Sequence, residues 1–573
     1  MRKISRPGRA CILTGIVVAA QLLHSWLNGP SALFFALHDS GIYFSSAGAI
    51  AEGDGQILPS LPGQPPQAKY PFLYPWLLSW VWRWQPSFPQ NAGLAAATSA
   101  LAGAWALAAY FWLLRRWPEM GDLPAFFCVT LTAFHGYFII LSGVVHADLP
   151  LMAAAATAAI LGDLAMNTKT ASSSRRLALA AALAAGVSLW LRSVGMAVVL
   201  GVLAAFWVRG YVRHAGVFLA GIVPFLAAQA GWAMHTAATP RMAEGAPFGW
   251  QQTWYYYTSY WRFWKVTVPD SAVFLNVIQS NLLDILIQPA RLCLFPPVGN
   301  SPASLMLAVA LSAGIIAGLV RHGARHGWRS IHFIVLFSVP AVLLWNFPIT
   351  TRLMMPFLPL FYAGLWLEGR RLTAAIAKTF RTEGDPAAKT AAGAITLGLV
   401  LVIGLAAESY VSSYRNVYAR NDEEASRTRE HAEIEEWVRR NTAKDTVLLS
   451  TDDVRLFLTT GRRAVWPLAF SAQPAYHYDL AQVRREASHF LDAGRHTGAR
   501  YWIVANHDVA LLNRTDVFRE TLPRLLEALP AVFRSSGGRY EVHDLACLQT
   551  PGNDGCNAAA PVLSNFYTDD PGS

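Results

Sequence analysis

Residues 177–208, LALAAALAAGVSLWLRSVGMAVVLGVLAAFWV, contain one charged side chain, Arg192, in 32 positions. A helix rises 1.5 Å per residue, so this segment would be about 48 Å long as a single helix. That length is too great for one comfortable crossing of a hydrocarbon core of about 30 Å, and short for two crossings. We predict two short helices that turn at Arg192, because this choice gathers most basic residues on one side of a membrane.

The rest of the first 409 residues is similarly apolar. Runs of about 15–25 apolar residues predict membrane-spanning helices. We place eleven spans near residues 10–37, 92–114, 123–142, 149–166, 177–191, 194–208, 215–234, 303–320, 331–346, 353–367 and 391–408. With Arg192 at an outer turn, the cytoplasmic segments hold 19 of the 27 basic residues of this part. These segments are Arg2–Arg9, Arg115–Arg116, Lys169–Arg176, Arg209–Arg213, Arg321–Arg329 and Arg370–Lys389.

The composition divides the chain into two parts. Hydrophobic residues make up 54% and charged residues 14% of the 573 residues, whereas roughly 25% charged is usual for a soluble domain. Residues 1–409 hold 27 Lys and Arg against 14 Asp and Glu, and residues 410–573 hold 19 against 22. The net charge of +10 therefore reflects membrane sidedness and not a basic surface for nucleic acid.

We predict a polytopic α-helical membrane domain over residues 1–409 and a small extracytoplasmic α/β domain over residues 410–573. The expected location is the cytoplasmic membrane of a bacterium, with the N-terminus inside and the C-terminal domain outside. In that domain the pattern predicts strands at Thr446–Ser450 and Tyr501–Ala505, helices at Asp479–Ala493 and Val517–Leu529, and a hairpin over Val532–Leu545 that turns at Ser536-Gly537-Gly538.

Two features of the outer domain leave alternatives open. Asp452-Asp453 follows the first predicted strand and could bind a ligand, but a solvated turn is the simpler interpretation. Cys547 and Cys556 could form a disulfide in an oxidising compartment.

Few ionisable residues lie on the outer side of the predicted membrane domain. Asp39 follows the first span and Asp148 lies between two spans, which makes each a candidate functional acid. Helix capping also explains such acids, since Pro150 suits the first turn of a helix. Arg192 and Arg352 occupy tight outer turns, where snorkelling to the interface and phosphate binding are both open explanations.

Two long outer segments, 38–91 and 235–302, hold the remaining candidates. Lys69 precedes the apolar patch Pro71–Trp84, where a lipid chain could enter, and a solvated loop lysine is the alternative. Residues Trp250–Trp264 include nine aromatic side chains in fifteen positions. They predict an aromatic belt at the membrane surface, a lid over a sugar or lipid, or both.

Several motifs, in their order and sidedness, resemble the GT-C glycosyltransferases. The resemblance is strongest to the lipid-carrier-dependent group that includes protein O-mannosyltransferases and aminoarabinose transferases. The motifs are Asp39 through Tyr43, Ala47, Gly53 and Gly55; Lys69-Tyr70-Pro71-Phe72-Leu73-Tyr74-Pro75; the loop of Asp148; Leu191-Arg192-Ser193-Val194-Gly195; and Thr351-Arg352-Leu353-Met354-Met355-Pro356-Phe357-Leu358-Pro359. An outer α/β tail is also typical of the group.

The resemblance implies a GT-C fold and transfer of a sugar from a polyprenyl-phosphate donor to a lipid, glycan or protein acceptor at the outer face. It makes Asp39 the catalytic acid of the first loop and Asp148 a second acid near the acceptor. Lys69 matches a lysine that contacts the donor phosphate, and Arg352 matches a cationic position near the donor. We add Tyr70, Arg192 and His146 as substrate-binding candidates; no cofactor is expected to be required, and a divalent metal is left open.

Two departures from the family pattern bear on the acceptor. Many members have Asp-Glu where this chain has Asp39-Ser40, which argues against a protein O-mannosyltransferase. The aminoarabinose transferases have an acid where this chain has Ala68. The alternative class is a transporter or flippase of lipid-linked sugars, although such proteins often show internal repeats and midplane charges that are not evident here.

Overall fold

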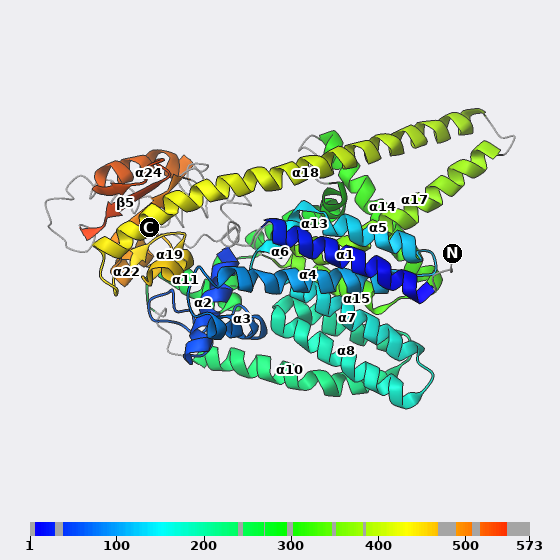
Figure 1. Cartoon of the computed structure of the whole chain (residues 1–573), viewed down its shortest axis with the longest axis horizontal. Coiled ribbons are helices and arrows are strands. Elements are labelled where there is room, and N and C mark those ends of the chain that lie inside the picture. Colours follow the sequence, from blue (N-terminus) through cyan, green and yellow to red (C-terminus); the bar gives the residue numbers. More distant parts are fainter. Residues whose placement is uncertain are drawn as a thin grey trace.

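The computed structural model describes residues 6–28, 38–238, 245–268, 270–294, 302–345, 351–381, 386–467, 489–506 and 516–546. Long helices lie side by side and form an elongated bundle (Figure 1). A small mixed sheet with its helices lies beyond one end of this bundle, and the first described helix, α1, begins at the other end (Figure 1). The predicted fold class, a helical membrane protein with a small C-terminal α/β domain, is confirmed.

The helical part contains α1 (Arg6–Asn28), α2 (His38–Glu52), α3 (Leu73–Trp84), α4 (Ala92–Leu114), α5 (Asp122–Ala133), α6 (Gly136–Gly143), α7 (Asp148–Asn167), α8 (Ala171–Leu191), α9 (Met196–Val208), α10 (Val212–Ala238), α11 (Phe248–Thr258), α12 (Tyr260–Thr267), α13 (Ser271–Leu294), α14 (Pro302–His326), α15 (Ser330–Leu343), α16 (Thr351–Met354), α17 (Leu358–Arg381) and α18 (Pro386–Asn441). Buried Ala, Val, Leu and aromatic side chains fill the space between them. The small side chains of α7 and α8 allow these two helices to pack closely.

Seven of the described helices are long and apolar enough to cross a membrane, and the pair α5–α6, bent by 63°, would make an eighth. The protein is therefore a multi-pass membrane protein, but the predicted count of eleven spans is not confirmed. Helices α9 and α15 coincide with predicted spans and are shorter than this criterion requires. Helix α13 is a candidate span that we had assigned to an outer segment, because Asp284 and Arg291 dilute its apolar pattern.

The predicted turn at Arg192 is confirmed. Helix α8 ends at Leu191, a 3-10 turn follows over Ser193–Gly195, and α9 begins at Met196. The backbone N–H of Gly195 donates to the carbonyl of Arg192 at 2.8 Å, which closes the turn. Residues 177–208 thus form two helices whose connection lies at the end of the bundle that faces the sheet (Figure 1).

Several predicted cytoplasmic segments meet at the opposite end of the bundle. Arg325 lies 3.7 Å from the carboxylate of Glu119, and Arg370 donates to the Glu119 carbonyl at 3.0 Å. Arg329 donates to the carbonyl of Arg116 at 3.4 Å. The basic loops therefore gather at one end, as the charge pattern predicts.

The C-terminal part contains β1 (Leu448–Leu449), α19 (Asp453–Thr460), β2 (Ala464–Val465), α22 (Asp492–Thr497), β3 (Tyr501–Ala505), α24 (Asp516–Ala528), β4 (Ala531–Arg534) and β5 (Tyr540–Asp544). The sheet order is β2-β1-β3-β5-β4, with β1 parallel to β2 and β3, and β5 antiparallel to β3 and β4. Both predicted strands and the predicted hairpin are present. Helix α18 is continuous from the far end of the bundle to this sheet (Figure 1).

Some expectations for this domain are wrong, and others concern residues outside the described ranges. Asp453 does not belong to a solvated turn, because its side chain is fully buried. Helix α19 and strand β2 were not predicted. Most of the predicted helix at 479–493 lies outside the described residues, and so do Cys547 and Cys556.

We expect Gly195→Ala to destabilise the α8–α9 turn. A Cβ at this position would overlap the backbone carbonyl of Ser188, and overpacking of this kind costs about 1–3 kcal/mol. The measurement is the melting temperature of the detergent-solubilised protein. Gly216→Ala in α10 is the control, since a Cβ there meets nothing within 4 Å. Equal melting temperatures for the two variants would contradict the prediction.

Candidate functional site

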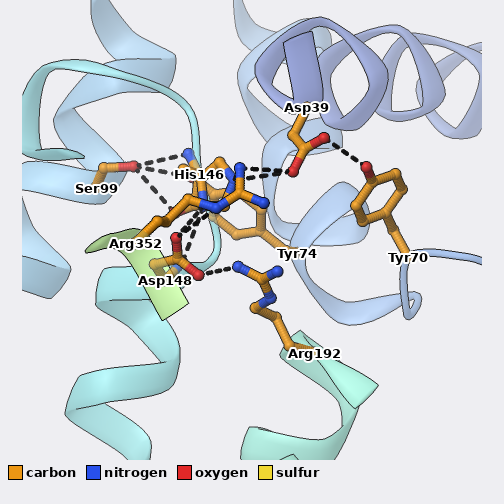
Figure 2. A network of polar contacts seen from close by, with 8 residues as sticks. All are labelled: Asp39, Tyr70, Tyr74, Ser99, His146, Asp148, Arg192 and Arg352. Atoms are coloured by element: carbon orange, nitrogen blue, oxygen red, sulfur yellow. Dashed lines mark hydrogen bonds and ion pairs between the residues drawn. The ribbon is translucent and has the colours of Figure 1, made fainter. Parts of the chain in front are cut away.

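The residues that the sequence singled out lie together at the end of the bundle that faces the sheet. Asp39 is in the first turn of α2, and Asp148 is in the first turn of α7. Arg192 follows α8, and Arg352 lies in α16. Figure 2 shows that these four side chains point toward one another from four separate segments.

Asp39 is 8% exposed and has three partners. The hydroxyl of Tyr70 donates to Asp39 Oδ1 at 2.6 Å. On the other oxygen, Arg352 Nη1 lies at 3.0 Å and His146 Nε2 at 3.2 Å. Burial on its own would raise the pKa of Asp39, but the Arg352 guanidinium and the hydrogen bond with His146 hold the pKa of that carboxyl well below its usual range.

Asp148 is buried on the other side of the same histidine. Its Oδ1 is paired with Arg192, and its Oδ2 lies 3.0 Å from His146 Nδ1. The N-cap residue of α7 is Ala147 and Asp148 is the first helical residue, so Asp148 does not cap this helix. Arg352 Nε lies 3.7 Å from Asp148 Oδ2, which brings the same guanidinium near both acids (Figure 2).

His146 connects the two halves of this cluster. Its ring nitrogens face Asp39 and Asp148, and Arg352 Nη1 lies 3.3 Å from Nε2. Ser99 in α4 fixes the backbone of His146 by accepting from its N–H at 3.3 Å, and Tyr74 lies 3.0 Å from Ser99 (Figure 2). The histidine is therefore held in place by the bundle itself.

Lys69 lies beside the cluster, with its Nζ 3.1 Å from the ring centroid of Tyr256. Among the residues that the structure describes, no carboxylate is within ion-pair distance of Lys69. Burial lowers the pKa of Lys69 to about 7, although nearby Asp39 opposes this shift. An anionic partner next to Lys69 would raise its pKa again and favour the protonated form.

A cavity of about 610 Å³ opens beside these cations. Its lining includes the polar side chains of Lys69, Tyr70 and Arg192. The remaining wall is mostly apolar and aromatic and is formed by Tyr43, Pro71, Ser193, Val194, Tyr260, Trp261, Trp264, Ala341, Val342, Leu344, Trp345 and Leu353. A cavity of this kind suits an amphiphile whose anionic head meets the cations and whose tail lies along the aromatic wall.

The charges of the site do not cancel. Lys69, Arg192 and Arg352 carry one more charge than Asp39 and Asp148 when the lysine is protonated. A singly charged phosphodiester would therefore balance the cluster. Within the described ranges, no group of three His, Cys, Asp or Glu side chains could hold a metal ion.

Sequence reasoning missed three aromatic members of the site. Tyr43 is fully buried, its ring centroid lies 4.6 Å from that of Tyr70, and its hydroxyl has no hydrogen-bond partner among the described residues. Tyr74 orders Ser99, and Tyr256 covers Lys69. The density of aromatic residues over 250–264 was the available signal for Tyr256, and the proximity of Tyr43 and Tyr74 to Asp39 and Lys69 in sequence was the signal for the others.

Comparison with known proteins supports one fold. No protein-family model and no curated protein sequence matches the chain. Among solved structures, ArnT from Cupriavidus metallidurans bound to undecaprenyl phosphate is 14% identical, with 94% of this chain and 98% of that chain covered and a TM-score of 0.52. The archaeal oligosaccharyltransferase AglB from Archaeoglobus fulgidus, in complex with an inhibitory peptide and a dolichol-phosphate, is 14% identical over 94% of this chain and 75% of that chain, with a TM-score of 0.50. The chain therefore has the GT-C fold of these lipid-carrier-dependent glycosyltransferases.

Proposed function

We propose that the protein is a membrane glycosyltransferase that moves a sugar from a polyprenyl-phosphate donor to an acceptor. The observation that carries this proposal is that two cations, Lys69 and Arg192, line a mostly apolar cavity of about 610 Å³. The cavity lies at the end of the bundle that faces the sheet. The phosphate of the donor would lie against Lys69 and Arg192, and the polyprenyl chain would follow the aromatic wall. The similar proteins support this donor class, because ArnT was solved with undecaprenyl phosphate and AglB with a dolichol-phosphate.

The reaction proposed is a direct displacement at the anomeric carbon. An acceptor hydroxyl or amine attacks that carbon, the bond from carbon to the phosphate oxygen breaks, and the polyprenyl phosphate leaves with the bonding electrons. The acceptor proton passes to Asp39. Attack opposite to the leaving phosphate inverts the anomeric centre, whether the sugar is a hexose or a pentose.

Two effects would lower the activation barrier. The cations would stabilise the charge on the leaving phosphate, which is the larger effect, and Asp39 would accept the proton of the acceptor. Asp39 has a pKa well below its usual range, so it is a weak base while Arg352 is paired with it. Lys69, Arg192 and Arg352 are fixed before the reaction and face the place where the phosphate would gain charge, which makes their stabilisation strong in a site with little water. Asp39 completes the reaction by accepting the proton late.

The proposed orientation follows from the two ends of the bundle. The basic loops around Glu119 would face the cytoplasm, and the site and the C-terminal domain would face outward, in the cytoplasmic membrane of a bacterium. Asp148, held by Arg192, would lie next to the acceptor. Ser40 and Ala68 leave the acceptor open among lipid, glycan and protein.

We expect Asp39→Asn to lower the rate of sugar transfer about 10²–10⁴-fold, while the protein stays folded in the membrane. Transfer is measured with a radiolabelled polyprenyl-phosphate sugar and membrane extracts as acceptor. Glu52→Gln is the matched control, because Glu52 is exposed at the other end of α2. Full activity of Asp39→Asn would show that Asp39 is not the base. Movement of the labelled lipid across the membrane without any transferred product would favour a transporter instead.

Donor binding should weaken as the pH rises through 7. Lys69, whose pKa burial lowers to about 7, is charged below that pH and neutral above it, whereas a phosphodiester keeps its charge throughout. If only the charged lysine binds, the Kd of a short-chain prenyl phosphodiester rises about tenfold from about pH 6 to pH 8. In the control variant Lys69→Arg the cation does not titrate, so its Kd should stay constant. The same pH dependence in both proteins would rule out Lys69 as the titrating group.

We also propose that transfer requires no divalent metal. Asp39 and Asp148, the two acids of the site, already face Arg352 and Arg192. Excess EDTA should therefore leave the transfer rate unchanged in purified protein. Loss of activity with EDTA and recovery with Mg²⁺ or Mn²⁺ would overturn this part of the proposal.

A further inference from the structure

Asp453 belongs to the C-terminal domain and reaches into the membrane domain. It is the first residue of α19, and its side chain is fully buried. One oxygen, Oδ1, lies 2.7 Å from His38 Nε2 and accepts from the indole N–H of Trp466 at 3.1 Å. The other oxygen accepts from the hydroxyl of Tyr257 at 3.0 Å. A buried carboxylate needs such partners, so these contacts fix the position of α19 on the membrane domain.

The contact between Asp453 and His38 bears on the position of Asp39, the proposed base. His38 is the residue before Asp39, and both lie in the first turn of α2. The histidine ring is also held edge-to-face against Trp466, with ring centroids 5.0 Å apart. Anchoring His38 from the C-terminal domain therefore fixes the start of α2 and, with it, the direction in which the Asp39 carboxylate points.

The contact between Asp453 and Tyr257 bears on the position of Lys69, the proposed ligand of the donor phosphate. Tyr257 follows Tyr256 in α11, and their rings lie 4.9 Å apart at nearly right angles. Tyr256 is the ring that covers Lys69 at 3.1 Å, and it also packs on Trp466 at 5.3 Å. Holding Tyr257 thus holds the aromatic surface against which Lys69 rests.

We propose that Asp453 is a positioning residue for both halves of the active site, and that the C-terminal domain is thereby part of the catalytic unit. The inference rests on the proposed function, since it assigns to one carboxylate the alignment of the base and of the donor-phosphate lysine. Its two oxygens hold two different residues. Oδ1 holds His38, which positions Asp39 (the His38 branch), and Oδ2 holds Tyr257, which positions Lys69 through Tyr256 (the Tyr257 branch). The branches predict different kinetic effects.

The branches can be separated by single substitutions. His38→Ala removes the support of Asp39 and should lower kcat about tenfold or more with little change in the KM for the donor. Tyr257→Phe removes only the hydroxyl and should raise the donor KM, and the Kd of a short-chain prenyl phosphodiester, about tenfold with little change in kcat. Asp453→Asn should show both effects. His38→Gln restores a donor to Asp453 and should recover part of kcat.

The matched control is Asp452→Asn, one residue away. Asp452 lies 3.4 Å from His431 Nε2 within the C-terminal domain and touches no residue of the site in the structure described. This variant should keep both kcat and KM. All rates are normalised to folded protein by size-exclusion chromatography, so a general loss of folding would not mimic a split between kcat and KM.

Each outcome decides something. Equal effects of Asp453→Asn and Asp452→Asn, or parallel changes of kcat and KM in both branch variants, would overturn the positioning role. Wild-type protein that binds the phosphodiester but transfers no sugar would contradict the proposed function, and the binding difference of Tyr257→Phe would still test the second branch. Wild-type protein that neither binds nor transfers would overturn both proposals.

Discussion

Ionised side chains that leave water have to find partners, and this requirement organises the end of the molecule where the candidate site lies. Asp39, Asp148, Arg192 and Arg352 come from four segments of the chain and are paired around His146. Removal of any one of these charges would leave a buried charge with fewer partners, so each of these segments is held by the others.

Lys69 takes no part in this pairing: among the described residues no carboxylate is within ion-pair distance of it, and it lines a mostly apolar cavity. In the proposed function, the cluster and the cavity divide the recognition of a lipid-linked donor between them. The fixed cations would hold the anionic head, and the aromatic wall would hold the tail. In the proposed reaction, Asp39 takes a proton less readily while it is paired with the Arg352 guanidinium.

Sequence reasoning identified the parts of this site but not their connections. Arg192 could be placed at a turn because loop charges distinguish one long helix from two short ones. Helix α13 was missed because Asp284 and Arg291 interrupt its apolar pattern. That His146 would lie between two acids depends on the approach of the start of α2 to the residues just before α7, which no local pattern encodes. Asp453 looked like an ordinary turn residue because its partners, His38 and Tyr257, are some two hundred residues or more away in sequence.

Helix α18 gives the C-terminal domain a fixed rotational setting. Its 56 residues extend over about 84 Å without a break, and its last turns pack under the sheet through Ile434 and Val438. A helix turns by about 100° per residue, so its length fixes not only the height of the domain but also the direction in which α19 faces. A homologous chain with one residue more in this helix would present another side of the domain to the membrane. The number of residues in α18 is thus itself under structural constraint, whatever side chains its exposed surface carries.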